Sequence, residues 1–130
     1  MAKKILLLED DMVLSQMYKD KLANAGFDVV GTDTGKKALT ILNSYMPDII
    51  LLDIMLPGGM NGFDFLQILK KDPKIKGVPV IVLTNLDSEK NTALELGATD
   101  YIIKSDTPLE NLVDLIKKHT KGSFVKNLIS

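Results

Sequence analysis

At 130 residues the chain has the length of one domain, and its 45% hydrophobic and 25% charged residues are typical of a globular protein rather than a disordered one. The formal charge of −1 argues against direct binding to nucleic acid, and no apolar run approaches the roughly 20 residues that span a membrane. Cysteine is absent, which excludes disulfides and thiolate chemistry and favours a cytoplasmic location.

Short β-like runs alternate with helical periods, which is the pattern of a sheet with crossover helices. The first run is apolar after its lysines, as expected of a strand covered on both faces. The second run alternates like a half-exposed edge strand. In chain order, the first half is predicted to contain a strand over 3–8, a helix from Asp10 or Asp11 to Gly26, a strand over 27–30, a helix from Asp33 or Thr34 to Pro47, and a strand over 48–53.

Glycine and proline mark the turns of the second half, including a loop after the third strand and Pro108 in the first turn of the last helix. In chain order, this half is predicted to contain a helix from 63 to about 72, a strand over 79–84, a helix from about 87 to 97, a strand over 101–103, and a helix from Pro108. Five strands alternating with five helices predict an α/β fold with a doubly wound parallel sheet of the order 2-1-3-4-5.

Three acidic positions follow strands that this order places side by side. Glu9 and Asp10 come after the first strand, and Asp53 ends the third. The carboxyl ends of parallel strands open onto one crevice, where ligands bind. Clustered carboxylates repel one another unless a cation joins them, and Mg²⁺ suits such oxygen ligands together with a phosphoryl oxygen. The sequence therefore predicts phosphoryl chemistry on Asp53.

The same edge of the predicted sheet carries Thr84 at the end of the fourth strand and Lys104 directly after the fifth. With these residues in place, the chain resembles the receiver domain of two-component response regulators over nearly its whole length. The matching segments are LLLEDD at 6–11, DIILLDIMLPG at 48–58, VIVLT at 80–84 and ELGATDYIIK at 95–104. The resemblance implies a flavodoxin-like receiver domain over residues 1–120, and residues 121–130 are expected to form a short C-terminal tail that frays or adds a turn.

The resemblance also implies how phosphorylation occurs. Asp53 would be the phosphoacceptor, and its carboxylate needs no general base to activate it. Mg²⁺ would be held by Asp10 directly, by Glu9 through water, by Asp53 itself and by the Met55 backbone carbonyl. The metal would offset the charge of the carboxylates and of the phosphoryl group.

Three further residues would bind the phosphoryl group or move in response to it. Thr84 would donate its hydroxyl to one phosphoryl oxygen, and Lys104 would place its ammonium on another. As Thr84 moves, the loop after the fourth strand would shift and Tyr101 would rotate inward. A local change of charge would thereby alter the surface formed by the fourth helix, fifth strand and fifth helix.

The implied function is that of a phosphorylation-activated signalling switch rather than a metabolic enzyme. Its phosphodonor would be a histidine kinase or a phosphotransfer protein, and an unidentified protein target would bind the surface just described. Direct binding to nucleic acid or to a membrane is not expected. A monomer and a dimer formed on activation fit the sequence equally well, and the sequence does not name the kinase or the pathway.

The chain departs from the usual receiver pattern at several positions. Ser105 follows Lys104 where proline, commonly in a cis peptide, is usual. A non-proline cis bond would cost roughly 3–4 kcal/mol, so a trans bond is predicted. Asn85 replaces a small residue and would narrow the site or form a hydrogen bond within it. The loop after the third strand is one residue longer than is usual in receiver domains, which predicts a bulge above the site. Met55 and Leu86 cannot hydrogen-bond an attacking water, which predicts slow autodephosphorylation.

The sequence leaves one main alternative function open and argues against two others. A receiver-like interaction module that does not switch by phosphorylation is the main alternative, and Ser105 and Asn85 support it. A phosphatase of the haloacid-dehalogenase type would need an acid–base aspartate where Met55 stands. A flavodoxin-like cofactor carrier would need a phosphate-binding loop where the sequence has acidic residues. Asp11 alone is assigned to helix capping, and His119 to the surface.

Overall fold

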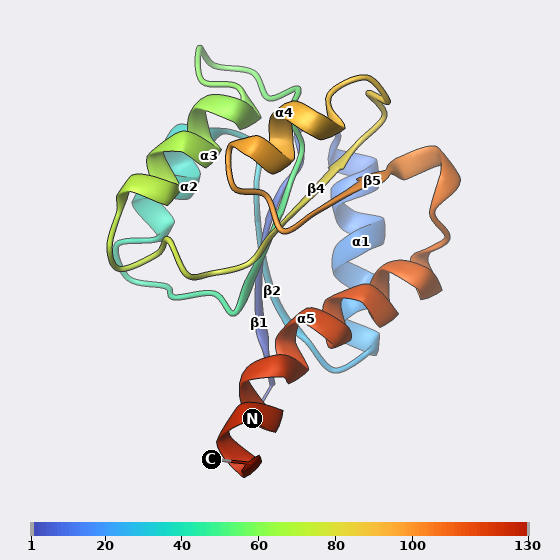
Figure 1. Ribbon diagram of the computed structural model, residues 1–130. Helices are drawn as coiled ribbons and strands as arrows, with labels where there is room; N and C mark the ends of the chain where they lie inside the picture. The colour runs from blue at the N-terminus through green and yellow to red at the C-terminus, as the bar shows by residue number, and fades with distance from the viewer. Residues whose placement is uncertain (1, 130) are drawn as a thin grey trace.

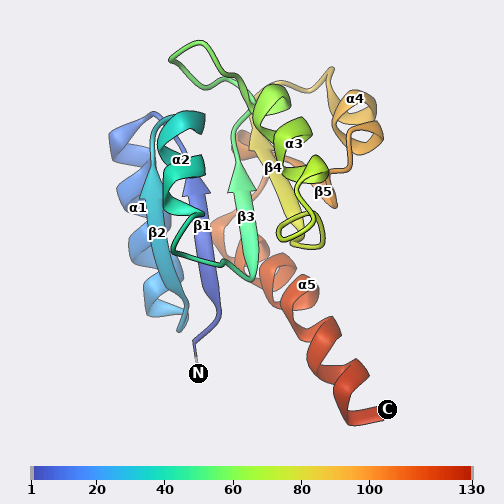
Figure 2. The same ribbon diagram turned by 90° about the vertical axis from the view of Figure 1, so that its left-hand side faces the viewer.

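The computed structural model describes residues 2–129, and the side chains of residues 2–120. Its elements are β1 (Lys4–Leu8), α1 (Met12–Asn24), β2 (Asp28–Thr32), α2 (Gly35–Ile41), β3 (Ile49–Leu52), α3 (Gly62–Lys71), β4 (Val80–Thr84), α4 (Lys90–Glu95), β5 (Asp100–Ile103), the 3₁₀ turn η1 (Lys104–Asp106) and α5 (Leu109–Ile129). The five strands form one parallel sheet in the order β2-β1-β3-β4-β5, as predicted. Helices α1 and α5 cover one face, and α2, α3 and α4 cover the other (Figures 1 and 2).

The central strands contribute side chains to two cores, because successive residues of a strand point to opposite faces. Leu6 and Leu8 of β1 pack on the side of α2, α3 and α4, whereas Ile5 and Leu7 pack on the side of α1 and α5. Strands β3 and β4 are buried throughout, and β2 at the edge is only partly buried. The register pairs Leu8 with Leu52, so the residues that follow them leave the sheet next to each other.

Capping residues fix where the first two helices begin. The Asp11 carboxylate accepts hydrogen bonds from the N–H groups of Val13 and Leu14, both at 3.0 Å, which confirms its assignment as the cap of α1. The Thr34 hydroxyl accepts from the Lys37 N–H at 3.2 Å at the start of α2. These caps satisfy backbone N–H groups at the starts of α1 and α2.

The loop after β3 projects past the end of the sheet (Figures 1 and 2). Gly58 and Gly59 turn it with φ angles of +88° and +83°, which side chains rarely adopt. Met60 then packs on the start of α2, where its sulfur lies 2.6 Å from the position that a Cβ on Gly35 would take. The longer loop, predicted as a bulge above the site, therefore leans toward α2.

Helix α4 is shorter than predicted, because the stretch after β4 is held in another conformation. The Leu86 N–H donates to the Thr84 hydroxyl at 3.4 Å, and the Leu86 carbonyl accepts from the Tyr101 hydroxyl. The helix consequently begins at Lys90 and not near Asp87.

Other boundaries also differ. Helix α2 ends at Ile41 and not just before Pro47 as predicted, because the N–H groups of Asn43 and Ser44 bond to carbonyls three residues back instead of four. The Phe27 N–H donates to the Leu22 carbonyl of α1 at 3.0 Å, so Phe27 belongs to the turn and β2 starts one residue later than predicted. Helix α5 continues to Ile129, further than the single turn expected of residues 121–130, a stretch with one glycine and no proline to stop a helix. Among the helices described, none has the length and hydropathy to cross a membrane.

Candidate phosphoryl-transfer site

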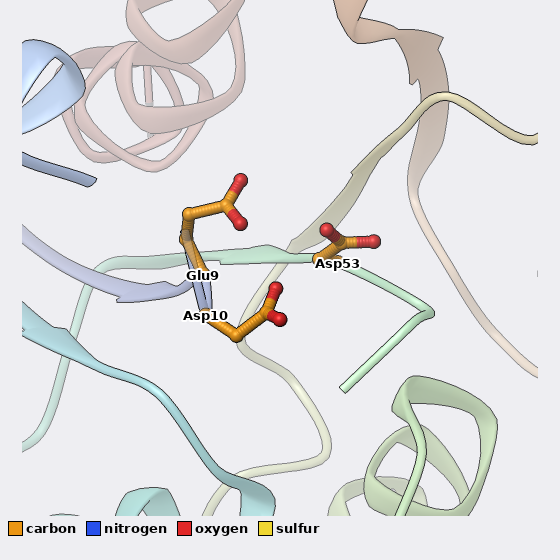
Figure 3. A group of neighbouring side chains, drawn as sticks. All are labelled: Glu9, Asp10 and Asp53. Carbon is orange, nitrogen blue, oxygen red and sulfur yellow. The ribbon is translucent and has the colours of Figure 1, made fainter. Parts of the chain in front are cut away.

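The three predicted acidic residues lie together at the carboxyl edge of the sheet. Figure 3 shows Glu9 and Asp10 at the end of β1 and Asp53 beside them at the end of β3. One carboxylate oxygen from each residue lies within 4.8 Å of the other two. Glu9 and Asp53 are buried, with 3% and 6% of their surface exposed, while Asp10 faces solvent. Such a set of carboxylates is suited to a hard divalent cation.

Lys104 reaches into this cluster from η1. Its ammonium donates a hydrogen bond to Asp53 Oδ2 at 2.7 Å and another to Glu9 Oε1. Only 10% of the Lys104 side chain is exposed, so this is a buried ion pair. The second oxygen of Asp53 accepts from the Met55 N–H at 3.1 Å, which fixes the orientation of the carboxylate.

The environment shifts the pKa values of the paired groups. Burial raises the pKa of the Glu9 carboxyl, and hydrogen bonds from Lys104 and from the Asp11 N–H offset only part of that rise. Burial by itself lowers the pKa of an ammonium, but the hydrogen bonds to Asp53 and Glu9 outweigh it and raise the pKa of Lys104. Glu9 is the deepest of these groups and shares one ammonium with a second carboxylate, so desolvation dominates there.

Thr84 lies at the cluster, and Tyr101 lies on the neighbouring strand β5, where it pairs with Val82 of β4. Thr84 is fully buried at the end of β4 and lines a pocket of about 330 Å³ together with the three acidic residues and Lys104. Tyr101 is turned inward, with 6% of its surface exposed, and holds the Leu86 carbonyl through its hydroxyl. Burial raises the pKa of Tyr101, so the phenol stays protonated and able to donate this hydrogen bond at neutral pH.

The structure also settles the geometry of two unusual positions. The peptide bond between Lys104 and Ser105 is trans, as predicted. The Asn85 side chain forms a hydrogen bond in which its Oδ1 accepts from the Ser105 N–H at 3.1 Å. Of the two outcomes considered for Asn85, a hydrogen bond at the site is therefore observed.

Gly62 is a positioning residue that the sequence analysis missed. A Cβ on Gly62 would lie 2.5 Å from the Asp53 carbonyl oxygen and 2.6 Å from Ile54 Cα, so only glycine fits. Its N–H also donates to the Ile54 carbonyl at 2.7 Å. The available signal was an Asn-Gly pair directly before an apolar helix, which was interpreted only as part of a loop.

The prediction for His119 is only partly correct. It does lie away from the cluster, where it lines a hollow with Lys3, Asp48 and Pro79 near the amino ends of the strands. However, 19% of its side chain is exposed, and its Nε2 is buried 3.5 Å from Asp100 Oδ2. His119 is therefore half-buried against β5 and not a free surface residue.

Comparisons with known proteins agree with this geometry. The sequence model described as the response regulator receiver domain matches residues 5–117. The DNA-binding response regulator MtrA of Mycobacterium tuberculosis is 40% identical over 112 residues, which cover 85% of this chain and 47% of MtrA. The phosphate regulon transcriptional regulatory protein PhoB of Klebsiella pneumoniae is 40% identical over 119 residues, or 90% of this chain and 51% of PhoB. The chain thus spans about half the length of these curated relatives.

Solved structures match over a larger share of their length. The chemotaxis response regulator CheY4 of Vibrio cholerae superposes with a TM-score of 0.84 at 26% identity, covering 92% of this chain and 99% of CheY4. The BeF₃-activated N-terminal receiver domain of RstA from Klebsiella pneumoniae gives the same TM-score at 34% identity, again covering 92% and 99% of the two chains. The chain therefore belongs to the response regulator receiver domain family, a family of signalling domains in two-component systems.

Proposed function

We propose that this domain is a phosphorylation-activated switch whose phosphoacceptor is Asp53. The observation that supports this most strongly is the pocket in which Glu9, Asp10, Thr84 and Lys104 surround the Asp53 carboxylate. A carboxylate oxygen would attack the phosphorus of a phosphohistidine, forming an O–P bond as the P–N bond breaks and its electron pair leaves with the imidazole nitrogen. Receiver domains take the phosphoryl group from histidine kinases, so a histidine kinase or phosphotransfer protein is the proposed donor.

The donor atoms of the site fit Mg²⁺. Asp10, Asp53 and the Met55 carbonyl would bind it, with Glu9 acting through water, and all of these are hard oxygen donors. When bound, Mg²⁺ supplies positive charge that offsets the repulsion between the phosphoryl group and the carboxylates. Lys104 contacts Glu9 and Asp53 in this structure, so its ammonium is already within reach of an oxygen added to Asp53.

The output of the switch would pass through Thr84 and Tyr101. The Thr84 hydroxyl now accepts a hydrogen bond from the Leu86 N–H, and it would donate its proton to a phosphoryl oxygen, which would draw Thr84 toward the phosphoryl group. Because Tyr101 holds the carbonyl of Leu86, a shift at Thr84 changes the loop that leads into α4. The surface of α4, β5 and α5 is the proposed binding face for a protein target, with the domain acting as a monomer or as a dimer formed on activation. A cytoplasmic location remains a prediction.

The test is the intact mass of the protein after incubation with acetyl phosphate, with and without Mg²⁺. One added phosphoryl group is expected in the presence of Mg²⁺, and none in Asp53→Asn. Asp87→Asn is the matched control, because this exposed aspartate lies on the loop after β4, outside the acidic cluster. If folded protein gains no mass and also fails to bind beryllofluoride, the alternative of a receiver-like interaction module that does not switch is favoured.

A further inference from the structure

One hydrogen bond connects the two loops that carry Thr84 and Lys104. Asn85 directly follows Thr84 at the end of β4, and Ser105 directly follows Lys104 in η1. The Asn85 side chain accepts from the Ser105 N–H at 3.1 Å, although the two residues lie 20 positions apart. The contact therefore joins the backbone beside one proposed phosphoryl ligand to the backbone beside the other.

The chemistry of this contact depends on both residue types. The donor is the backbone N–H of Ser105, which a proline at this position would not have. The acceptor is a side-chain oxygen, which alanine or glycine at position 85 could not supply. Asn85 and Ser105, each unusual when taken alone, are thus the two halves of one interaction.

We propose that Asn85 is a positioning residue, which holds the Lys104 ammonium on Asp53 through its hydrogen bond to Ser105. Lys104 Nζ lies 2.7 Å from Asp53 Oδ2, and the start of η1 sets where that side chain originates. Both Asn85 and Ser105 are exposed, so their hydrogen bond contributes little to the stability of the core. Its main effect is on the position of the backbone beside Lys104. Thr84 and Lys104 are consequently tied together and move as one unit. This inference rests on the proposed role of Asp53.

Four variants test the proposal through the rate constant of phosphorylation by acetyl phosphate at saturating Mg²⁺. Asn85→Ala removes the acceptor, and Ser105→Pro removes the donor and also restricts the backbone of Lys104 before it. Each is expected to lower the rate by about three- to tenfold, which corresponds to the loss of one ordinary hydrogen bond. The double variant is expected to be no slower than either single variant. Ser105→Ala keeps the N–H and is the matched control, with a rate that stays within about twofold of the parent.

A second measurement uses the unphosphorylated protein. Hydrogen exchange should show the Ser105 amide losing protection in Asn85→Ala, and NMR should show the Lys104 ammonium signal shifting or broadening. Ser105→Ala should leave the ammonium signal unchanged. The proposal is overturned if Asn85→Ala changes neither readout, or if Asn85→Ala slows phosphorylation equally in the Ser105→Pro background. If the parent takes up no phosphoryl group, the proposed function fails, and exchange and NMR alone decide the role of Asn85.

Discussion

Replacing Lys104 with methionine tests whether its ammonium neutralises the acidic cluster. Methionine is similar in length and carries no charge, so the change removes the cation that lies between Glu9 and Asp53. The side chains of the three residues are only 10%, 2% and 8% exposed in the order Lys104, Glu9 and Asp53. Two buried carboxylates would then face each other without a partner, and removing one member of a buried pair typically costs about 3–5 kcal/mol.

Protonation of Glu9 sets an upper limit to this loss of stability. Glu9 can escape the repulsion by taking up a proton, since burial already raises its pKa. A carboxyl with the ordinary pKa of 4.5 lies about 2.5 units below pH 7, so protonating it at pH 7 costs about 3.4 kcal/mol at 1.36 kcal/mol per unit. At pH 5 the same step costs only about 0.7 kcal/mol. The folded variant binds a proton that the unfolded chain releases, so its stability rises as the pH falls toward 5.

Urea unfolding followed by circular dichroism, without divalent ions, measures both values. We expect the free energy of unfolding of Lys104→Met to be lower than that of the parent by about 3 kcal/mol at pH 7 and by about 1 kcal/mol or less at pH 5. Lys21→Met is the matched control, because Lys21 pairs with Glu110 at 3.1 Å with 38% and 70% of the side chains exposed. It should lose less than about 1 kcal/mol at both pH values. Equal losses in the two variants, or a loss in Lys104→Met that does not depend on pH, would refute the reasoning.

Three further outcomes are expected. Gly62→Ala should lower the free energy of unfolding by about 1–3 kcal/mol, because its Cβ would clash with the backbone of Asp53 and Ile54. Gly77→Ala, which has open space around it, should be nearly neutral in the same urea unfolding experiment. Tyr101→Phe should cost about 0.5–1.5 kcal/mol and speed hydrogen exchange in the loop before α4, because the Leu86 carbonyl loses its donor. The acyl phosphate should outlast seconds by intact mass after donor removal, since Met55 and Leu86 cannot position water; decay within seconds would contradict this.

The site was predictable because its parts stand at the ends of strongly apolar strands. Once the strand order was inferred, the pairing of β1 with β3 followed, and with it the approach of Glu9 and Asp10 to Asp53. Local sequence was sufficient for this, because buried parallel strands leave few places for a charged side chain except their ends. Thr84 and Lys104 were found for the same reason, each at the end of its own strand.

The features that were missed depend on contacts between distant segments. The sequence near Asp87 could begin a helix, but the Tyr101 hydroxyl of β5 holds the Leu86 carbonyl, and α4 begins only at Lys90. The need for glycine at position 62 arises because the loop brings it against the backbone of Asp53, a contact that the Asn-Gly pair alone does not specify. His119 was assigned to the surface because its contact with β5 is equally non-local.

The position of Lys104 would link the proposed metal binding to the proposed switch. Its ammonium holds two of the three carboxylates that would bind Mg²⁺, so the site is compact before any cation enters. If Mg²⁺ binds there, it would share these carboxylates with Lys104, because one ammonium cannot offset three negative charges. A phosphoryl group on Asp53 would add negative charge that draws Lys104 outward. Through Ser105 and Asn85 that movement would reach the loop after β4, so charge at the acidic cluster and the conformation of that loop would be coupled in one equilibrium.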